Sequence, residues 1–297
     1  MGSTDGLTWK VEQRYIGFFV FQCGRQENSR VLVGHVLKGT FIITMPYNPK
    51  RILKNIVRRF GIDIVRADNP ADTFHADWYL RLTARRLEHL ASLRIPIANM
   101  TVLEVGAGIG DQSTYYIDRG NRITITDARP KSIEYLKKHF PEYDIQYLDM
   151  DSPLPISSSP FDVVHCYGLL YHLSRPKDAL KFLSGCCKRM LFLETCVSFG
   201  NEKSINFVTE DKSIHIYAIS GTGCRPTRRW VFETLQELFE YVYVPKTQPN
   251  HEQFPTNWTD SSKHQHSLSR AIFVATHEKI DNELLSPSLI SHQQRHE

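Results

Sequence analysis

The sequence has no long apolar run, no paired-cysteine motif and no large excess of charge of one sign. The longest early apolar stretch, Ile16 to Phe21, is far below the ~18 residues of a membrane-spanning helix. The six cysteines form no CxxC pair, and the adjacent Cys186 and Cys187 lack the spacing of a four-ligand zinc site. The N-terminus also lacks the basic and apolar regions of a secretory signal. We therefore expect reduced thiols, no metal site and a cytoplasmic location.

What remains is an ordinary globular composition, in which 41% of the 297 residues are hydrophobic and 23% are charged. The formal net charge of +4 is unevenly distributed. Residues 1–99 carry 15 basic and 8 acidic side chains, whereas residues 100–297 carry 21 basic and 24 acidic ones. The positive excess therefore lies in the first third, and a polyanionic partner of the remainder, such as a nucleic acid, is disfavoured.

The N-terminal extension, residues 1–44, contains two β-like runs. Tyr15–Phe21 and Val31–Thr44 are separated by the polar segment Gly24–Arg30, which predicts a hairpin. The alternative is a poorly ordered extension, or translated sequence upstream of a start at Met45.

Residues 45–99 predict a basic helical cap. Asn48-Pro49 is a helix-start signal, and the helix expected over residues 50–66 separates apolar from basic side chains. This helix either exposes a solvated basic face or contacts an anionic membrane surface or a protein partner. A second helix is expected over Ala76–Leu93, and near its start His75, Trp78 and Tyr79 either cover a cofactor or pack between helices.

Strand-like and helical patterns alternate along residues 100–200, which predicts an α/β, doubly wound and mostly parallel sheet. The predicted strands are Thr101–Val105, Arg122–Thr126, Ile145–Leu148, Phe161–Cys166 and Met190–Glu194. The predicted helices are Asp111–Arg119, Lys131–Phe140 and Lys177–Cys187. A helix over Arg228–Glu240 and strands over Tyr241–Val244 and Arg270–Thr276 follow, and the last two strands are expected to pair antiparallel. Residues 277–297 are polar and aperiodic, so we expect a flexible tail.

The strongest single signal is VLEVGAGIG at residues 102–110, where an apolar strand ends in a glycine turn that opens a helix. Glycines suit this turn because the backbone bends tightly and a ligand approaches it closely. The next strand ends at Asp127, where an acid accepts both hydroxyls of a ribose bound over the turn. Glu104, inside the first strand, suits a cationic or amine-bearing ligand better than the pyrophosphate of a nicotinamide dinucleotide.

A further acidic motif, Leu148-Asp149-Met150-Asp151, follows the third strand, where an adenine amino group would lie. The alternative is that Asp149 and Asp151 only begin a turn.

In order, VLEVGAGIG (102–110), Asp127, LDMD (148–151) and FDVVHCYGLLYHL (161–173) resemble the motifs of class I S-adenosylmethionine-dependent methyltransferases, over about residues 75–276. The resemblance implies a seven-stranded Rossmann-like fold and S-adenosyl-L-methionine as cofactor. It implies that Glu104 and the glycines hold the methionine end, Asp127 the ribose and Asp149 the adenine amine. The implied cofactor-binding residues are Glu104, Gly106, Ala107, Gly108, Gly110, Asp127, Ala128, Asp149, Met150, Tyr167, Gly168 and Tyr171. The segment Leu169–Leu180 is also similar to type 11 methyltransferases and to the enzyme that carboxymethylates wobble uridine in tRNA.

Two histidines are candidate general bases. His172 follows the fourth strand at the edge where open α/β sheets bind ligands, and it either accepts a substrate proton or has a structural role. His251 lies in the loop Pro245–Trp258, whose composition suits a lid. His264 and His266 could join His251 in weak chelation, but a solvated loop is the favoured interpretation.

Residues 195–269 are expected to form a lid and the acceptor site. Arg225, Arg228 and Arg229 surround the predicted start of a helix capped by Thr227, so either an anionic ligand or nearby acids such as Glu233 offset their charge. Asn250 and Trp258 are further candidate acceptor contacts.

The sequence therefore predicts an S-adenosylmethionine-dependent methyltransferase that O-methylates a small polar acceptor, either anionic or sugar-like. The alternatives are a tRNA-modifying methyl or carboxymethyl transferase, a non-catalytic cofactor-binding module and a nicotinamide oxidoreductase. Glu104 and the segment after the fourth strand disfavour the last of these.

Overall fold

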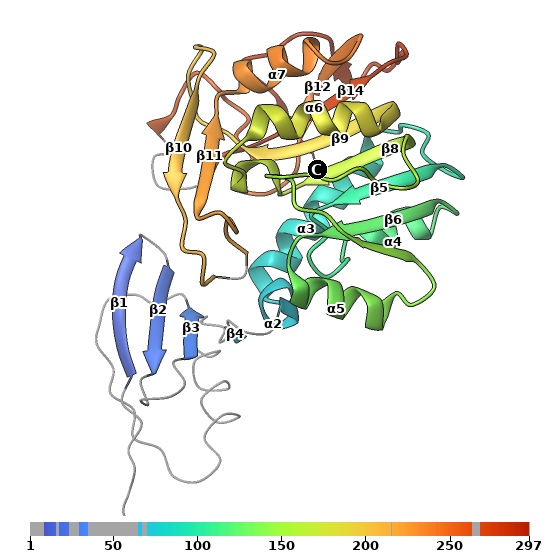
Figure 1. Ribbon diagram of the computed structural model, residues 1–297. Helices are drawn as coiled ribbons and strands as arrows, with labels where there is room; N and C mark the ends of the chain where they lie inside the picture. The colour runs from blue at the N-terminus through green and yellow to red at the C-terminus, as the bar shows by residue number, and fades with distance from the viewer. Residues whose placement is uncertain are drawn as a thin grey trace, which may run out of the picture. The chain divides into compact units, whose positions relative to one another are not determined.

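The structure is a computed structural model that describes residues 9–15, 18–23, 30–34, 65–66, 70–214, 216–262 and 268–296. The chain divides into two compact units, Met1–Leu80 and Arg81–Glu297. Figure 1 shows the elements of both.

The first unit contains a four-stranded antiparallel sheet in the order β1-β2-β3-β4. Its strands are Trp9–Tyr15, Phe18–Cys23, Arg30–Gly34 and Val65–Arg66. Strand β2 pairs antiparallel with β3 in the part of the N-terminal extension where a hairpin is one of the two expectations, and β1 was not predicted. Most of the helix predicted for residues 50–66 lies outside the described residues, but its last two residues form β4, so the prediction is wrong at that end. The short helix α2, Pro70–Phe74, follows.

The second unit is built on an eight-stranded sheet in the order β15-β12-β14-β9-β8-β5-β6-β7. Its strands are β5 (Thr101–Val105), β6 (Arg122–Asp127), β7 (Asp144–Tyr147), β8 (Phe161–Tyr167), β9 (Cys187–Cys196), β12 (Tyr241–Pro245), β14 (Arg270–Thr276) and β15 (Leu285–Ser286). The strands β5 to β9 are joined by parallel pairings, and β14 is antiparallel to both of its neighbours. The predicted doubly wound, mostly parallel sheet is confirmed, and β15 adds a short strand to the seven expected.

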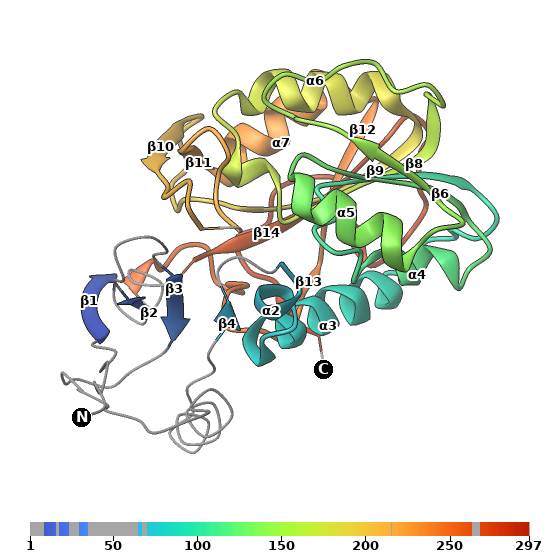
Figure 2. The ribbon, with the colours of Figure 1, turned by 60° about the horizontal axis from the view of Figure 1, so that its bottom comes forward.

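Helices cover both faces of this sheet (Figure 2). Helices α3 (Asp77–Ser92), α4 (Ser113–Ile117) and α5 (Pro130–His139) lie on one face, and α6 (Pro176–Cys186) and α7 (Arg228–Gln236) lie on the other. Proline starts α5 and α6, where its missing N–H costs nothing. Thr227 caps α7 as predicted, because its hydroxyl accepts the Trp230 N–H at 3.2 Å. Among the described residues, no helix is both long and apolar enough to cross a membrane.

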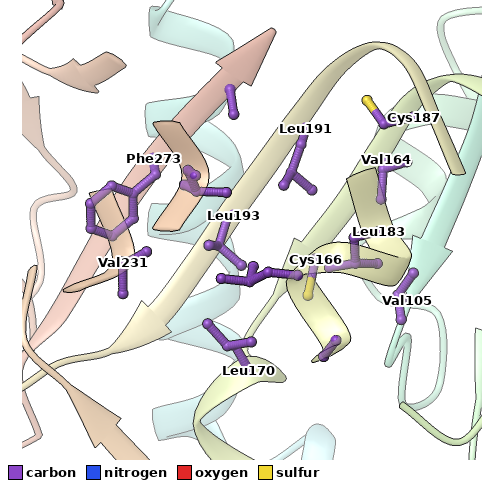
Figure 3. Close-up of a cluster of buried hydrophobic side chains, with 14 of the residues drawn as sticks. Val105, Val164, Cys166, Leu170, Leu183, Cys187, Leu191, Leu193, Val231 and Phe273 are labelled. Atoms are coloured by element: carbon purple, nitrogen blue, oxygen red, sulfur yellow. The ribbon is translucent and has the colours of Figure 1, made fainter. Parts of the chain in front are cut away.

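The core follows from the alternation of side chains along the central strands. On β9, Leu191 and Leu193 enter the cluster beneath α6 and α7, whereas Phe192 enters the cluster on the α3 side. Figure 3 shows the first cluster, in which these leucines lie near Leu183 of α6 and Val231 of α7. Two buried faces explain why the central strands read as nearly continuous apolar runs.

An insertion between β9 and α7, residues 197–226, carries a separate two-stranded sheet. Its strands are β10 (Ile205–Thr209) and β11 (Thr222–Pro226), which pair antiparallel. The short 3-10 helix η1, Leu170–His172, follows β8 and packs against β11. The insertion therefore lies at the carboxyl end of β8.

The prediction of a flexible tail over residues 277–297 is wrong for its described part. Besides β15, this segment contains β16 (Gln294–Arg295), which pairs with β13 (Thr247–Gln248). Arg295 Nη1 donates to the carbonyls of Pro249, His251 and Phe254 at 2.6, 3.0 and 2.8 Å. The C-terminal segment forms hydrogen bonds with the backbone of the loop after β12. Backbone carbonyls need polar partners, which agrees with the polar sequence of this segment.

Candidate functional site

The glycine turn after β5 adopts the backbone conformation that glycine favours. Gly106, Gly108 and Gly110 have φ angles of 72°, 62° and 86°. A Cβ added at Gly110 would lie 2.7 Å from the Phe140 ring, so α5 also needs a glycine there. The Ala107 N–H donates to the Thr126 carbonyl at 2.9 Å, which ties the turn to β6.

Asp127, at the end of β6, is bound to this turn. Its Oδ2 accepts the Gly108 N–H at 2.9 Å and its Oδ1 accepts the Arg129 N–H at 2.7 Å. Burial raises the pKa of Asp127, although these two hydrogen bonds oppose the rise. The half-buried Ala128 follows. The predicted junction of the glycine turn and Asp127 is therefore present.

Glu104 is a buried acid beneath the turn. Its carboxylate accepts a hydrogen bond from the Ser113 hydroxyl. Burial raises the pKa of Glu104 to about 8, and the negative charges of Asp111 and Asp127 add to the rise. Glu104 is therefore protonated at neutral pH in the absence of a bound cation.

Both acids after β7 accept hydrogen bonds from backbone N–H groups. Asp149 is half-buried, and its Oδ1 accepts the Asp151 N–H at 3.0 Å. Asp151 Oδ1 accepts the backbone N–H groups of Ser174 and Arg175 at 2.8 and 3.1 Å, as the turn-forming alternative expects. Met150 is buried in the core cluster beneath α6 and α7.

The end of β8 adjoins both the glycine turn and α3. A Cβ added at Gly106 would lie 3.0 Å from Leu169, and one added at Gly168 would lie 3.2 Å from Arg86 Nη2. Tyr167 is buried, and its hydroxyl has no hydrogen-bond partner among the described residues. The segment 167–169 therefore contacts the turn through Leu169 and contacts Arg86 through Gly168.

Arg86 belongs to a buried ionic network that the sequence did not reveal. Arg86 Nη2 donates to Glu194 Oε2 at 2.6 Å, and Arg270 Nη1 donates to Glu194 Oε1 at 3.0 Å. The three side chains are 1%, 0% and 4% exposed for Arg86, Glu194 and Arg270. Arg270 Nη2 also donates to the Tyr171 hydroxyl at 3.3 Å. Two guanidinium groups face one carboxylate, and within the described residues Arg86 Nε and Nη1 have no partner.

His172 pairs with a carboxylate from the insertion. Its Nδ1 lies 2.6 Å from Glu210 Oε2, and Arg225 Nη2 donates to Glu210 Oε1 at 3.2 Å. Burial lowers the pKa of His172, against the opposing effect of Glu210. The His172 ring is therefore neutral at pH 7. Because the carboxylate only accepts hydrogen bonds, Nδ1 carries the proton.

His251 lies in a different setting. It is buried, its Nδ1 accepts the Gln253 N–H at 3.2 Å, and burial lowers its pKa to about 4. The neighbouring Asn250 is exposed. Arg295 and Gln293 of the C-terminal segment form hydrogen bonds with the loop that contains Asn250 and His251. The indole N–H of Trp258, in the same loop, donates to Gln293 at 2.6 Å. This loop is thus hydrogen-bonded to the C-terminal segment.

The structure does not bring the three predicted arginines together. Arg225 bonds to Glu210 and to the Tyr171 carbonyl. Arg228 is buried, lies 4.1 Å from the centre of the Trp258 ring and donates to the Ile290 carbonyl at 3.0 Å. Arg229 pairs with Glu233 at 2.6 Å on the surface, as the salt-bridge alternative expects.

Other candidates contribute less to the site. His264 and His266 lie outside the described residues, within which there is no group of three or more His, Cys, Asp or Glu able to hold a metal ion. Tyr79, in the first unit, packs edge-on against Phe74 and Trp78.

Arg129 connects the end of β6 to the insertion. Its guanidinium donates to the Tyr217 carbonyl and, at 3.4 Å, to the Ile214 carbonyl. The insertion therefore contacts the ends of both β6 and β8, a link that sequence spacing alone could not reveal.

Comparison with known proteins agrees with this geometry. Residues 102–190 match the family model described as a methyltransferase domain. The chain is 27% identical over 151 residues to a ubiquinone biosynthesis O-methyltransferase of Caulobacter vibrioides, covering 49% of this chain and 55% of that protein. It is 33% identical over 113 residues to a tRNA U34 carboxymethyltransferase of Campylobacter jejuni, covering 36% of this chain and 38% of that protein. The matches thus span about half or less of these relatives.

Among solved structures, the N-terminal domain of EvdMO1, crystallised in the presence of SAH and D-fucose, is similar with a TM-score of 0.50 at 18% identity. That similarity covers 65% of this chain and 82% of the other. Together with the strand order and the glycine turn, it defines the class I S-adenosylmethionine-dependent methyltransferase fold. The chain has this fold, and the part of it that matches the family model is residues 102–190.

Proposed function

We propose that the chain transfers a methyl group from S-adenosylmethionine to a hydroxyl oxygen of a small polar acceptor. The observation that carries the proposal is the junction of β5 and β6, where the Asp127 carboxylate is bound to Gly108 of the glycine turn at 2.9 Å. An acid held at this junction accepts ribose hydroxyls.

The charged and polar side chains near the glycine turn and at the end of β8 suit the groups of the proposed cofactor. S-adenosylmethionine supplies an electrophilic methyl group on a sulfonium, and its methionine end carries an ammonium and a carboxylate. The buried Glu104 suits the ammonium. The unpartnered Nε and Nη1 of Arg86 suit the carboxylate, since buried donors left without a partner are costly. Asp149 remains our candidate for the adenine amine.

His172 supports oxygen as the accepting atom. It lies directly after β8, it is neutral at pH 7, and with its proton on Nδ1 its Nε2 lone pair is available to take the proton of a hydroxyl. Alignment of the two substrates supplies much of the remaining rate enhancement. Because Arg225, Arg228 and Arg229 are dispersed among separate partners, we limit the proposal to a neutral polar acceptor.

Binding of S-adenosylhomocysteine tests this proposal directly. By calorimetry the protein should bind S-adenosylhomocysteine and not NAD, and the reverse result would refute the proposal. The change Asp127→Asn should weaken binding by about 1.5–3 kcal/mol, roughly 10- to 150-fold, because it removes a charged acceptor. The control Asp118→Asn alters an exposed acid at the end of α4 and should leave the affinity unchanged.

A further inference from the structure

Glu210 connects the insertion to the end of β8. Its Oε2 accepts hydrogen bonds from His172 Nδ1 at 2.6 Å and from the Ala218 N–H at 2.7 Å. Its Oε1 accepts from Arg225 Nη2 at 3.2 Å. The Glu210 side chain is 7% exposed and that of His172 13%. Both carboxylate oxygens are therefore occupied, and their positions are fixed.

We propose that Glu210 is a positioning residue for methyl transfer, which holds His172 with its proton on Nδ1 and its Nε2 lone pair directed to the acceptor hydroxyl. This inference rests on the proposed function. It makes the insertion a part of the active site rather than only a cover, because the insertion supplies the residue that orients the base.

Two contacts fix the imidazole. The Glu210 carboxylate accepts the Nδ1 proton and thereby selects one tautomer. The Tyr171 ring lies against the imidazole, with ring centres 3.9 Å apart and an angle of 43° between the planes. A base that is oriented by a third group is the arrangement found in the Ser-His-Asp triad.

The charges around His172 explain its protonation state. Glu210 after β10 raises the pKa of His172, whereas Arg225 of β11 and Arg270 of β14 lower it, and burial lowers it most. His172 is thus a neutral base at pH 7. When it takes a proton, the imidazolium lies against the Glu210 carboxylate, which stabilises the new charge.

Gly223 shows that the packing around Glu210 is close. A Cβ added at Gly223 would lie 2.6 Å from Glu210 Oε1 and 2.7 Å from the Tyr171 carbonyl. Only a glycine allows β11 to approach both the carboxylate and η1. Gly223 in the run Gly221-Thr222-Gly223 is the local sequence signal for this contact.

The test is ¹⁵N NMR of the full-length protein labelled in its histidine rings, with His172 assigned by comparison with His172→Gln. In the wild type we expect the neutral Nδ1–H tautomer. In Glu210→Gln we expect the pKa of His172 to fall by about one unit, because the nearby negative charge is lost. The matched control Glu202→Gln removes an exposed carboxylate of the same insertion and should leave the titration of His172 unchanged.

Two results overturn the inference: an Nε2–H tautomer in the wild type, or the same pKa for His172 in the wild type and Glu210→Gln. If Glu210→Gln does not fold, the wild-type tautomer alone decides. Calorimetry with S-adenosylhomocysteine on the same samples separates the two proposals. A wild type with the expected tautomer that binds no S-adenosylhomocysteine refutes the proposed function, and with it the role of Glu210 in methyl transfer.

Discussion

Glu104 and Asp127 are buried carboxyl groups at the junction of β5 and β6, and burial raises the pKa of both. Asp127 accepts two backbone N–H groups, which favour its charged form. Glu104 accepts the Ser113 hydroxyl, and burial raises its pKa to about 8, which favours the protonated form at neutral pH. More hydrogen bonds therefore oppose the rise in pKa at Asp127 than at Glu104, although both acids lie in the same buried region.

At this scale we predict that ligand binding releases a proton from Glu104. An ammonium group favours the ionised carboxyl, whereas the free protein holds the proton below its pKa of about 8. The affinity for S-adenosylhomocysteine should therefore rise with pH, roughly five- to tenfold per unit between pH 6 and 8. Calorimetry in buffers of different ionisation enthalpy should show close to one proton released at pH 7.

The variant Glu104→Gln provides the control for this linkage. It keeps a polar side chain that can accept from Ser113, but it has no proton to release. Its proton release should be absent and its affinity independent of pH over the same range. Equal wild-type affinities at pH 6 and pH 8 would contradict the prediction.

At the scale of helices and strands, local patterns predicted the elements that carry their own signal. Strand β5 and the start of α7 at the Thr227 cap lie where the sequence placed them. The strands β15 and β16 were missed because each is two residues long and depends on pairing with a distant partner. Strand β1 has apolar residues at Trp9, Val11 and Tyr15, but the polar Gln13 interrupts the alternation, so its local signal was incomplete.

The residues of the site likewise fall into those that local motifs predict and those that depend on partners far away in the sequence. The glycine turn and Asp127 follow from motif spacing, whereas Glu210 lies 38 positions from His172 and Glu194 lies 108 positions from Arg86. No periodicity joins residues so far apart. The weak signal was an acid inside an apolar strand, Glu194 in the run MLFLET, because a buried charge needs a partner.

The C-terminal segment gives a prediction at the element scale. The change Arg295→Gln removes a guanidinium nitrogen that bonds to three carbonyls of the loop after β12. Because the side chain is only partly buried, we expect a loss of about 1–2 kcal/mol in the free energy of unfolding, measured with urea. Hydrogen exchange should become faster at Phe254, whose N–H donates to the His251 carbonyl at 3.0 Å.

A matched substitution in the same segment isolates this effect. Lys279→Gln also removes one positive charge, but Lys279 is exposed. It should change stability by less than about 0.5 kcal/mol. If the two variants are equally stable, the bonds of Arg295 do not hold the loop.

At the scale of the whole second unit, the Arg86–Glu194–Arg270 network joins segments that are far apart in the chain. Arg86 lies on α3, Glu194 on β9 and Arg270 at the start of β14. All three are buried, and Arg270 extends the network to Tyr171 beside His172. The network therefore joins the helix before the sheet and the last long strand to the end of the sheet that carries the site.

We predict that Glu194→Gln destabilises this unit strongly. It leaves two buried guanidinium groups facing a neutral amide, and breaking a buried ion pair in this way costs about 3–5 kcal/mol. For a unit of this size the melting temperature should fall by roughly 10 °C. Glu237→Gln removes a carboxylate from exposed pairs with Lys177 and Lys203, so it should leave the melting temperature nearly unchanged. Both variants change the net charge equally, so only burial separates them, and equal melting temperatures would show that the network does not hold these segments together.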